Sequence, residues 1–119
     1  MSDAPYETVV LVTCAPYQGR KSEEVLEAIM SLALFDRSHA VVFWDQGLEW
    51  LVDGQSPAQG KNLSRQLAAL PLYGSEALFY CEEHREAGWQ AQPGSDVATP
   101  LTVQAIAQTL RQARYIEVF

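Results

Sequence analysis

The chain has 119 residues, of which 48 % are hydrophobic and 19 % are charged, a composition typical of globular proteins and not of disordered ones. This length predicts one domain that spans residues 1–119. The net charge of −7 argues against direct binding of nucleic acid, because proteins that grip phosphates carry basic patches.

The sequence also indicates where the protein works. Residues 1–6 lack the basic and apolar segments of a signal peptide, and no apolar run approaches the ~20 residues that span a bilayer. Two cysteines, Cys14 and Cys81, are too few for a disulfide scaffold, although the sequence leaves a single bridge between them open. We therefore expect a cytoplasmic protein with reduced thiols and no membrane contact.

The first half of the chain reads as strand, helix, strand. Thr8–Thr13 and Ala40–Trp44 are short β-branched or apolar runs, typical of strands covered on both faces. Between them, Ser22 is a plausible N-cap for a helix that carries apolar residues at helical spacing up to Ala33. A short helix is expected over Gln46–Val52.

The second half continues this alternation. Its expected elements are a leucine-rich helix that ends at Pro71, a strand over Ala77–Cys81, a short helix over Glu82–Ala87, a minimal strand over Asp96–Ala98, a helix capped by Thr102 and a strand over Tyr115–Phe119. Such alternation predicts an α/β fold, with a mostly parallel sheet of about five strands and helices on both faces. The expected arrangement is a flavodoxin-like three-layer fold.

Cys81 is the candidate reactive residue. It closes an apolar strand, and the carboxyl ends of parallel strands are where reactive groups collect. A helix beginning directly after it would favour a thiolate through the helix dipole. The alternative is that Cys81 is a small apolar residue in the core. Glu82 and Glu83 favour this alternative, because adjacent carboxylates disfavour a thiolate.

Other chemical motifs are not found in the sequence. The first strand–helix loop contains one glycine, Gly19, and neither of the glycine-rich patterns that cradle phosphates. His39 and His84 lie 45 positions apart and have no ligand-like spacing with the cysteines. We expect no metal and no cofactor. A flavodoxin-like domain that binds a nucleotide or flavin is an alternative resting on fold analogy alone.

Several segments, in their order and spacing, resemble a known family. They are Leu32–Asp36, Ala40–Leu48, the Gly54–Gln55 turn, Leu70–Gly74 leading to Cys81, the later Gly88 and the terminal strand at Phe119. Together they resemble the TusC/DsrF branch of the DsrE-like sulfur-relay family over nearly the whole chain. The resemblance implies a flavodoxin-like α/β layer.

The resemblance also implies partners and a function. The expected assembly is a dimer of heterotrimers with B-type and D-type sister subunits, which passes persulfide sulfur from an upstream carrier to a downstream acceptor. In most bacteria the sulfur reaches the 2-thiouridine at the tRNA wobble position. In sulfur oxidisers it enters the dissimilatory pathway, and the sequence leaves both destinations open.

Cys81 lies where the D-type sister subunit has its sulfur-carrying cysteine, whereas the C-type branch is regarded as lacking an active one. With its acidic neighbours, this favours a structural subunit that has no catalysis of its own. A persulfide carrier acting through Cys81 is the alternative. Cys14 occupies a position where family members commonly have a small hydroxyl residue, and we expect no sulfur role for it.

Large aromatic residues suggest how such a subunit contacts its partners. Trp44 and Tyr80 are expected in the core. A domain of this size cannot bury every ring, and aromatic residues are enriched in interface cores. We therefore predict that Trp50 or Trp89 contributes to a subunit interface, with Tyr73 as a further candidate.

Overall fold

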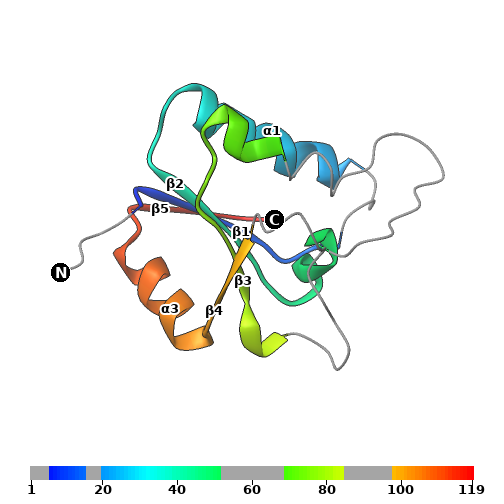
Figure 1. Ribbon diagram of the computed structural model, residues 1–119, viewed down its shortest axis with the longest axis vertical. Helices are drawn as coiled ribbons and strands as arrows, with labels where there is room; N and C mark the ends of the chain where they lie inside the picture. Colours follow the sequence, from blue (N-terminus) through cyan, green and yellow to red (C-terminus); the bar gives the residue numbers. More distant parts are fainter. Residues whose placement is uncertain (1–5, 16–19, 52–68, 85–97) are drawn as a thin grey trace.

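The computed structural model describes residues 6–15, 20–51, 69–84 and 98–119 (Figure 1). Its one sheet contains β1 (Thr8–Val12), β2 (His39–Phe43), β3 (Leu78–Cys81), β4 (Ala98–Leu101) and β5 (Tyr115–Val118) in the order β4-β3-β2-β1-β5. Every neighbouring pair is parallel. Parallel neighbours require crossover connections, which place helices on the faces of the sheet. The predicted α/β fold with a five-stranded parallel sheet is confirmed.

The helices lie on opposite faces of this sheet. Helix α1 (Lys21–Leu34) and helix α3 (Val103–Gln112) flank the strands from the two sides in Figure 1. Three short 3₁₀ helices complete the described elements, namely η1 (Asp45–Leu51), η2 (Leu70–Tyr73) and η3 (Glu82–His84). All strand carboxyl ends meet at one edge of the sheet, which we call the carboxyl edge, and the opposite edge is the amino edge.

Each face of the sheet has its own apolar cluster, because side chains alternate along a strand. Val10 and Val12 of β1 face α1, whereas Val9 faces α3. The larger cluster, on the α1 side, consists of Val10, Val12, Val25, Ile29, Val41, Phe43, Leu48, Trp50, Leu51, Leu70, Leu78 and Tyr80. The smaller cluster, on the α3 side, consists of Val9, Val42, Cys81 and Ile106. Cys81 therefore belongs to the core.

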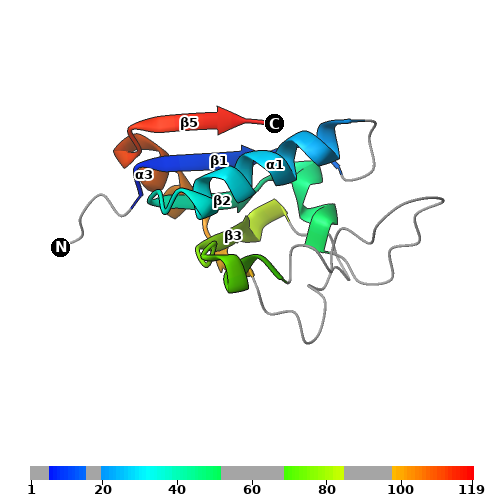
Figure 2. The same cartoon turned by 90° about the horizontal axis from the view of Figure 1, so that it is seen from above.

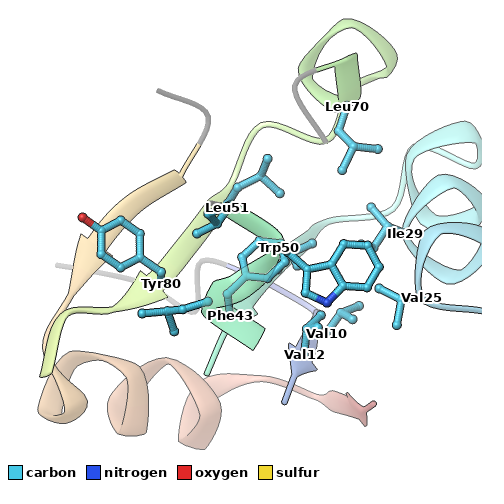
Figure 3. Packing of buried hydrophobic residues seen from close by; sticks show 12 residues of the cluster. Val10, Val12, Val25, Ile29, Phe43, Trp50, Leu51, Leu70 and Tyr80 are labelled. Carbon is cyan, nitrogen blue, oxygen red and sulfur yellow. The ribbon is translucent and has the colours of Figure 1, made fainter. Parts of the chain in front are cut away.

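Trp50 occupies the centre of the larger cluster. Figure 3 shows its indole ring between strand residues and Val25 and Ile29 of α1. The side chain is 0 % exposed, and its Nε1–H donates to the Cys14 carbonyl at 2.9 Å. The ring of Phe43 lies 6.5 Å away, centroid to centroid. The core thus buries the apolar indole of Trp50 and also provides a hydrogen-bond acceptor for its N–H.

Two helix boundaries differ from the sequence-based expectation. Helix α1 begins at Lys21 with Arg20 as N-cap, so the prediction of a Ser22 cap was wrong; Ser22 lies buried in the first turn. The expected stop at Pro71 was also wrong, because η2 continues to Tyr73. Proline is tolerated in a first turn, where its missing N–H needs no partner. The start of the predicted leucine-rich helix and most of the predicted Glu82–Ala87 helix lie outside the described residues.

Candidate functional site

The Cys81 thiol lies at the carboxyl edge, at the last residue of β3. Cys81 is 0 % exposed and packs in the α3-side cluster. Opposite it, Leu101 of β4 shares the same face of the sheet. The thiol is a free one, as is that of Cys14. A reagent or a sulfur donor therefore reaches Cys81 only after the chain opens locally.

The surroundings of Cys81 hold the thiol in its neutral form. Burial is the main cause that raises its pKa, and the carboxylates of Glu83 and Glu82 raise it further. The backbone N–H groups of His84 and Glu83 hydrogen-bond the thiol and act in the opposite direction. The pKa of Cys81 remains above its ordinary value, which disfavours the thiolate that sulfur transfer requires.

The residues that follow Cys81 form hydrogen bonds that attach η3 to neighbouring segments. The Glu83 carboxylate accepts a hydrogen bond from the Val103 N–H at 3.0 Å, at the N-terminus of α3. A carboxylate is favourable there because it complements the helix dipole. Thr102 caps the same helix by accepting from the Ala105 N–H at 3.1 Å, as predicted. Glu83 is exposed, and its carboxylate also provides a hydrogen-bond partner for the first turn of α3.

His84 provides a second attachment. Its Nδ1 accepts from the Asp45 N–H at 2.9 Å, so in the neutral ring the proton is on Nε2. Asp45 has a positive φ of 56°, which turns the chain sharply after β2 and aims this N–H at His84. The Trp44 ring packs edge-on against His84 with centroids 4.3 Å apart. Nothing in the local sequence pattern signals these contacts, which join segments 39 residues apart.

Cys14 lies at the same edge, after β1, and is partly exposed. The Cys14 carbonyl accepts a hydrogen bond from the Trp50 indole N–H, so the backbone of Cys14 has a structural role. Among the described residues, no group of three or more His, Cys, Asp and Glu side chains is arranged to hold a metal ion.

The three interface candidates have different environments. Trp50 has no exposed surface to offer a partner, so its place as an interface candidate needs correction: the ring fills the core beneath α1. Tyr73 is 54 % exposed in η2. Trp89 lies outside the described residues. Tyr80 is buried and Trp44 is partly buried against the α3-side cluster.

Tyr73 belongs to an exposed apolar surface, which we call the α1–η2 patch and define as Leu34, Phe35, Leu72 and Tyr73. These side chains are 69 %, 75 %, 85 % and 54 % exposed, respectively. Helix α1 and η2 pack against each other, and Figure 1 shows them side by side on one face. Contiguous exposed apolar surface marks sites of protein contact.

The patch and the thiol lie at opposite ends of the sheet. Leu34 and Phe35 precede the start of β2, and Tyr73 precedes the start of β3, whereas Cys81 ends β3. An open pocket of about 300 Å³, lined by Ser31, Leu32, Phe35 and Arg37, borders the patch. The patch therefore lies away from Cys81, at the other end of the strands.

Among the described residues, no helix is both long and apolar enough to cross a membrane.

Comparisons with known proteins place this geometry in a family. Residues 7–116 match the DsrE/DsrF-like family. A similar curated protein is the Protein TusC homolog of Pseudomonas aeruginosa, 34 % identical over 67 residues, which are 55 % of this chain and 56 % of that protein. The match thus spans about half the length of this relative. The crystal structure of the YchN protein of E. coli shares the fold, with a TM-score of 0.80 and 19 % identity over 96 % of this chain and 99 % of that one. The chain belongs to the DsrE/DsrF-like family.

Proposed function

We propose that this protein is a structural subunit of a sulfur-relay complex, in which a sister subunit carries the persulfide. Membership of the DsrE/DsrF-like family and the similarity to a protein named as a TusC homolog support a sulfur-relay role. The observation that carries the structural assignment is the Cys81 thiol, which is 0 % exposed and has a raised pKa. A carrier thiol must be both accessible and readily ionised.

The proposed partners are B-type and D-type sister subunits, assembled as a dimer of heterotrimers. The α1–η2 patch supports a permanent partner, because four large apolar side chains on the surface of one small chain favour burial. Tyr73 adds an aromatic ring with a polar tip, a side chain enriched at interfaces.

Mapping the transferred sulfur tests the assignment directly. The complex is purified through this subunit, loaded with a persulfide donor, and digested for mass spectrometry. We expect the added sulfur atom on a sister subunit and not on Cys81, and unchanged transfer in a Cys81→Ser variant. Cys14→Ser serves as the matched control for removal of a thiol. Sulfur on Cys81 would contradict the structural assignment.

The interface is tested with variants of the patch. Leu72→Asp, in a side chain that is 85 % exposed, should weaken binding of the sister subunits without unfolding the chain. Tyr73→Ala should weaken it less. Gln108→Ala, at an exposed position of α3 on the other face, is the control. Binding that tolerates Leu72→Asp would remove the patch from the interface.

A persulfide carrier acting through Cys81 is the second candidate. Two backbone N–H groups, those of Glu83 and His84, point at the thiol and would stabilise a negative sulfur there. If partner binding exposed the thiol while η3 kept its place, these donors would assist Cys81. The sulfur map distinguishes the two candidates.

The proposed destination of the sulfur is the 2-thiouridine at the tRNA wobble position, and the alternative is dissimilatory sulfur oxidation. We propose a cytoplasmic location and no direct contact with nucleic acid, in keeping with the net charge of −7. Quantifying 2-thiouridine in tRNA from cells with and without this chain tests the destination. An unchanged level would favour the alternative.

A further inference from the structure

The two edge strands of the sheet are protected to different degrees. Strand β4 contains Pro100, which has no N–H to donate and therefore disfavours the pairing of another strand at that edge. Strand β5, at the other edge, reads Tyr-Ile-Glu-Val and contains no proline or lysine. All four of its residues are exposed, and Figure 2 shows it at the rim of the sheet beyond β1. An open, apolar edge of this kind is a template for another strand.

The free hydrogen-bonding groups of β5 can be assigned from its bonds to β1. Tyr115 N–H donates to the Glu7 carbonyl and Phe119 N–H to the Leu11 carbonyl, both at 2.9 Å, so odd-numbered residues bond inward. Because successive residues of a strand alternate, Ile116 directs its N–H and C=O outward. Ile116 is therefore the centre of the open edge.

The side chains of β5 divide between the two faces of the sheet. Ile116 and Val118 are in register with Val9 and Leu11, on the α3 side, and are 47 % and 61 % exposed. Tyr115 and Glu117 point to the α1 side. The Arg114 guanidinium lies 5.6 Å from the centre of the Tyr115 ring. The edge thus presents apolar side chains on one face and both signs of charge on the other.

We propose that β5 pairs antiparallel with β5 of a second copy of this chain. A second copy is the favoured occupant because, among the strands that the structure describes, β5 alone has an edge without proline. Two identical edges that hydrogen-bond across a twofold axis run antiparallel. Head-to-tail addition of β5 to β4 would meet Pro100. The inference does not depend on the proposed function, since it needs only copies of this chain.

Charge selects the register of this pairing. In an antiparallel pair, the outward-bonding residues of one copy must face those of the other. The two registers that meet this condition with the greatest overlap of β5 place the twofold axis at Ile116 or at Glu117. An axis at Glu117 would oppose two carboxylates in a closely spaced pair, which is destabilising. An axis at Ile116 stacks the two isoleucines and places Glu117 of one copy opposite Tyr115 of the other, beside Arg114. The register centred on Ile116 is therefore assigned.

Disulfide trapping tests the pairing and its register together. Cysteine is introduced singly as Ile116→Cys, Glu117→Cys or Val118→Cys in the full chain carrying Cys14→Ser, and mild oxidation is followed on non-reducing gels. Opposed Cα atoms of a hydrogen-bonded antiparallel pair lie ~5.5 Å apart, within disulfide range. We expect Ile116→Cys to form dimers at least tenfold faster than the other two. Fastest trapping of Glu117→Cys would overturn the register, and equal or absent trapping would overturn the pairing.

Sedimentation equilibrium supplies a second, reversible measurement. Four residues per chain form a small contact, so we expect a weak, concentration-dependent dimer. Ile116→Pro removes the outward N–H and should weaken the dimer at least tenfold more than Ile116→Ala, with far-UV circular dichroism as the folding control. Glu117→Gln should also weaken it, whereas it would strengthen a dimer centred on Glu117. If Ile116→Pro fails to fold, the trapping series still decides.

Discussion

Replacing Trp50 by alanine tests whether this residue belongs to the core or to an interface. The ring is 0 % exposed between α1 and the sheet, and its N–H bonds to the Cys14 carbonyl. If it fills the core, its removal destabilises the isolated chain. If it formed an interface, its removal would mainly affect binding of a partner.

The expected loss of stability follows from this burial. Removing a buried tryptophan side chain destabilises a protein by about 3–5 kcal/mol, because the cavity collapses only in part. That is a large share of the ~5–15 kcal/mol that stabilises a typical domain. Trp50→Phe retains most of the apolar contact and loses the N–H, so we expect a loss of about 1–2 kcal/mol.

Urea unfolding followed by circular dichroism measures both values, with ΔG extrapolated to zero denaturant. Tyr73→Ala is the matched control, since Tyr73 is 54 % exposed and should change the stability by less than about 0.5 kcal/mol. A Trp50→Ala chain that loses less than about 1 kcal/mol, yet no longer binds sister subunits, would refute the core assignment.

Three further predictions concern other described contacts. Gly47→Ala should destabilise the chain by about 3 kcal/mol in urea unfolding, because a Cβ there would overlap the Val12 carbonyl oxygen; an unchanged midpoint would contradict this tight backbone packing. Glu83→Gln should lower the free energy of unfolding in urea by about 0.3–1 kcal/mol, because a neutral side chain complements the start of α3 less well; an unchanged free energy would contradict the capping role. The raised pKa of Cys81 means that, as pH increases above about 8.5, the unfolded thiol loses its proton before the native one does. The stability should therefore decline there, more steeply than in Cys81→Ala, and parallel curves would contradict the raised pKa.

The architecture of this protein follows closely from its sequence. Short β-branched runs alternate with segments of helical periodicity, and that alternation admits few arrangements other than a parallel sheet between helices. The Thr102 cap was predictable because an N-cap bonds only three residues ahead, to Ala105. The position of Cys81 at the end of a strand was also evident, since it depends on local pattern.

The roles of individual polar and aromatic residues depended on contacts between distant segments. Trp50 is in the core because the Cys14 carbonyl, 36 residues earlier, and α1 enclose it. Glu83 is a helix cap because α3 begins beside it, 20 residues later. The open edge at β5 exists only because the chain crosses back past β1 after α3. Local periodicity reports which residues an element buries, but which neighbour covers each face is set when the elements pack, and that tertiary arrangement decided both the environment of Cys81 and the exposed surfaces.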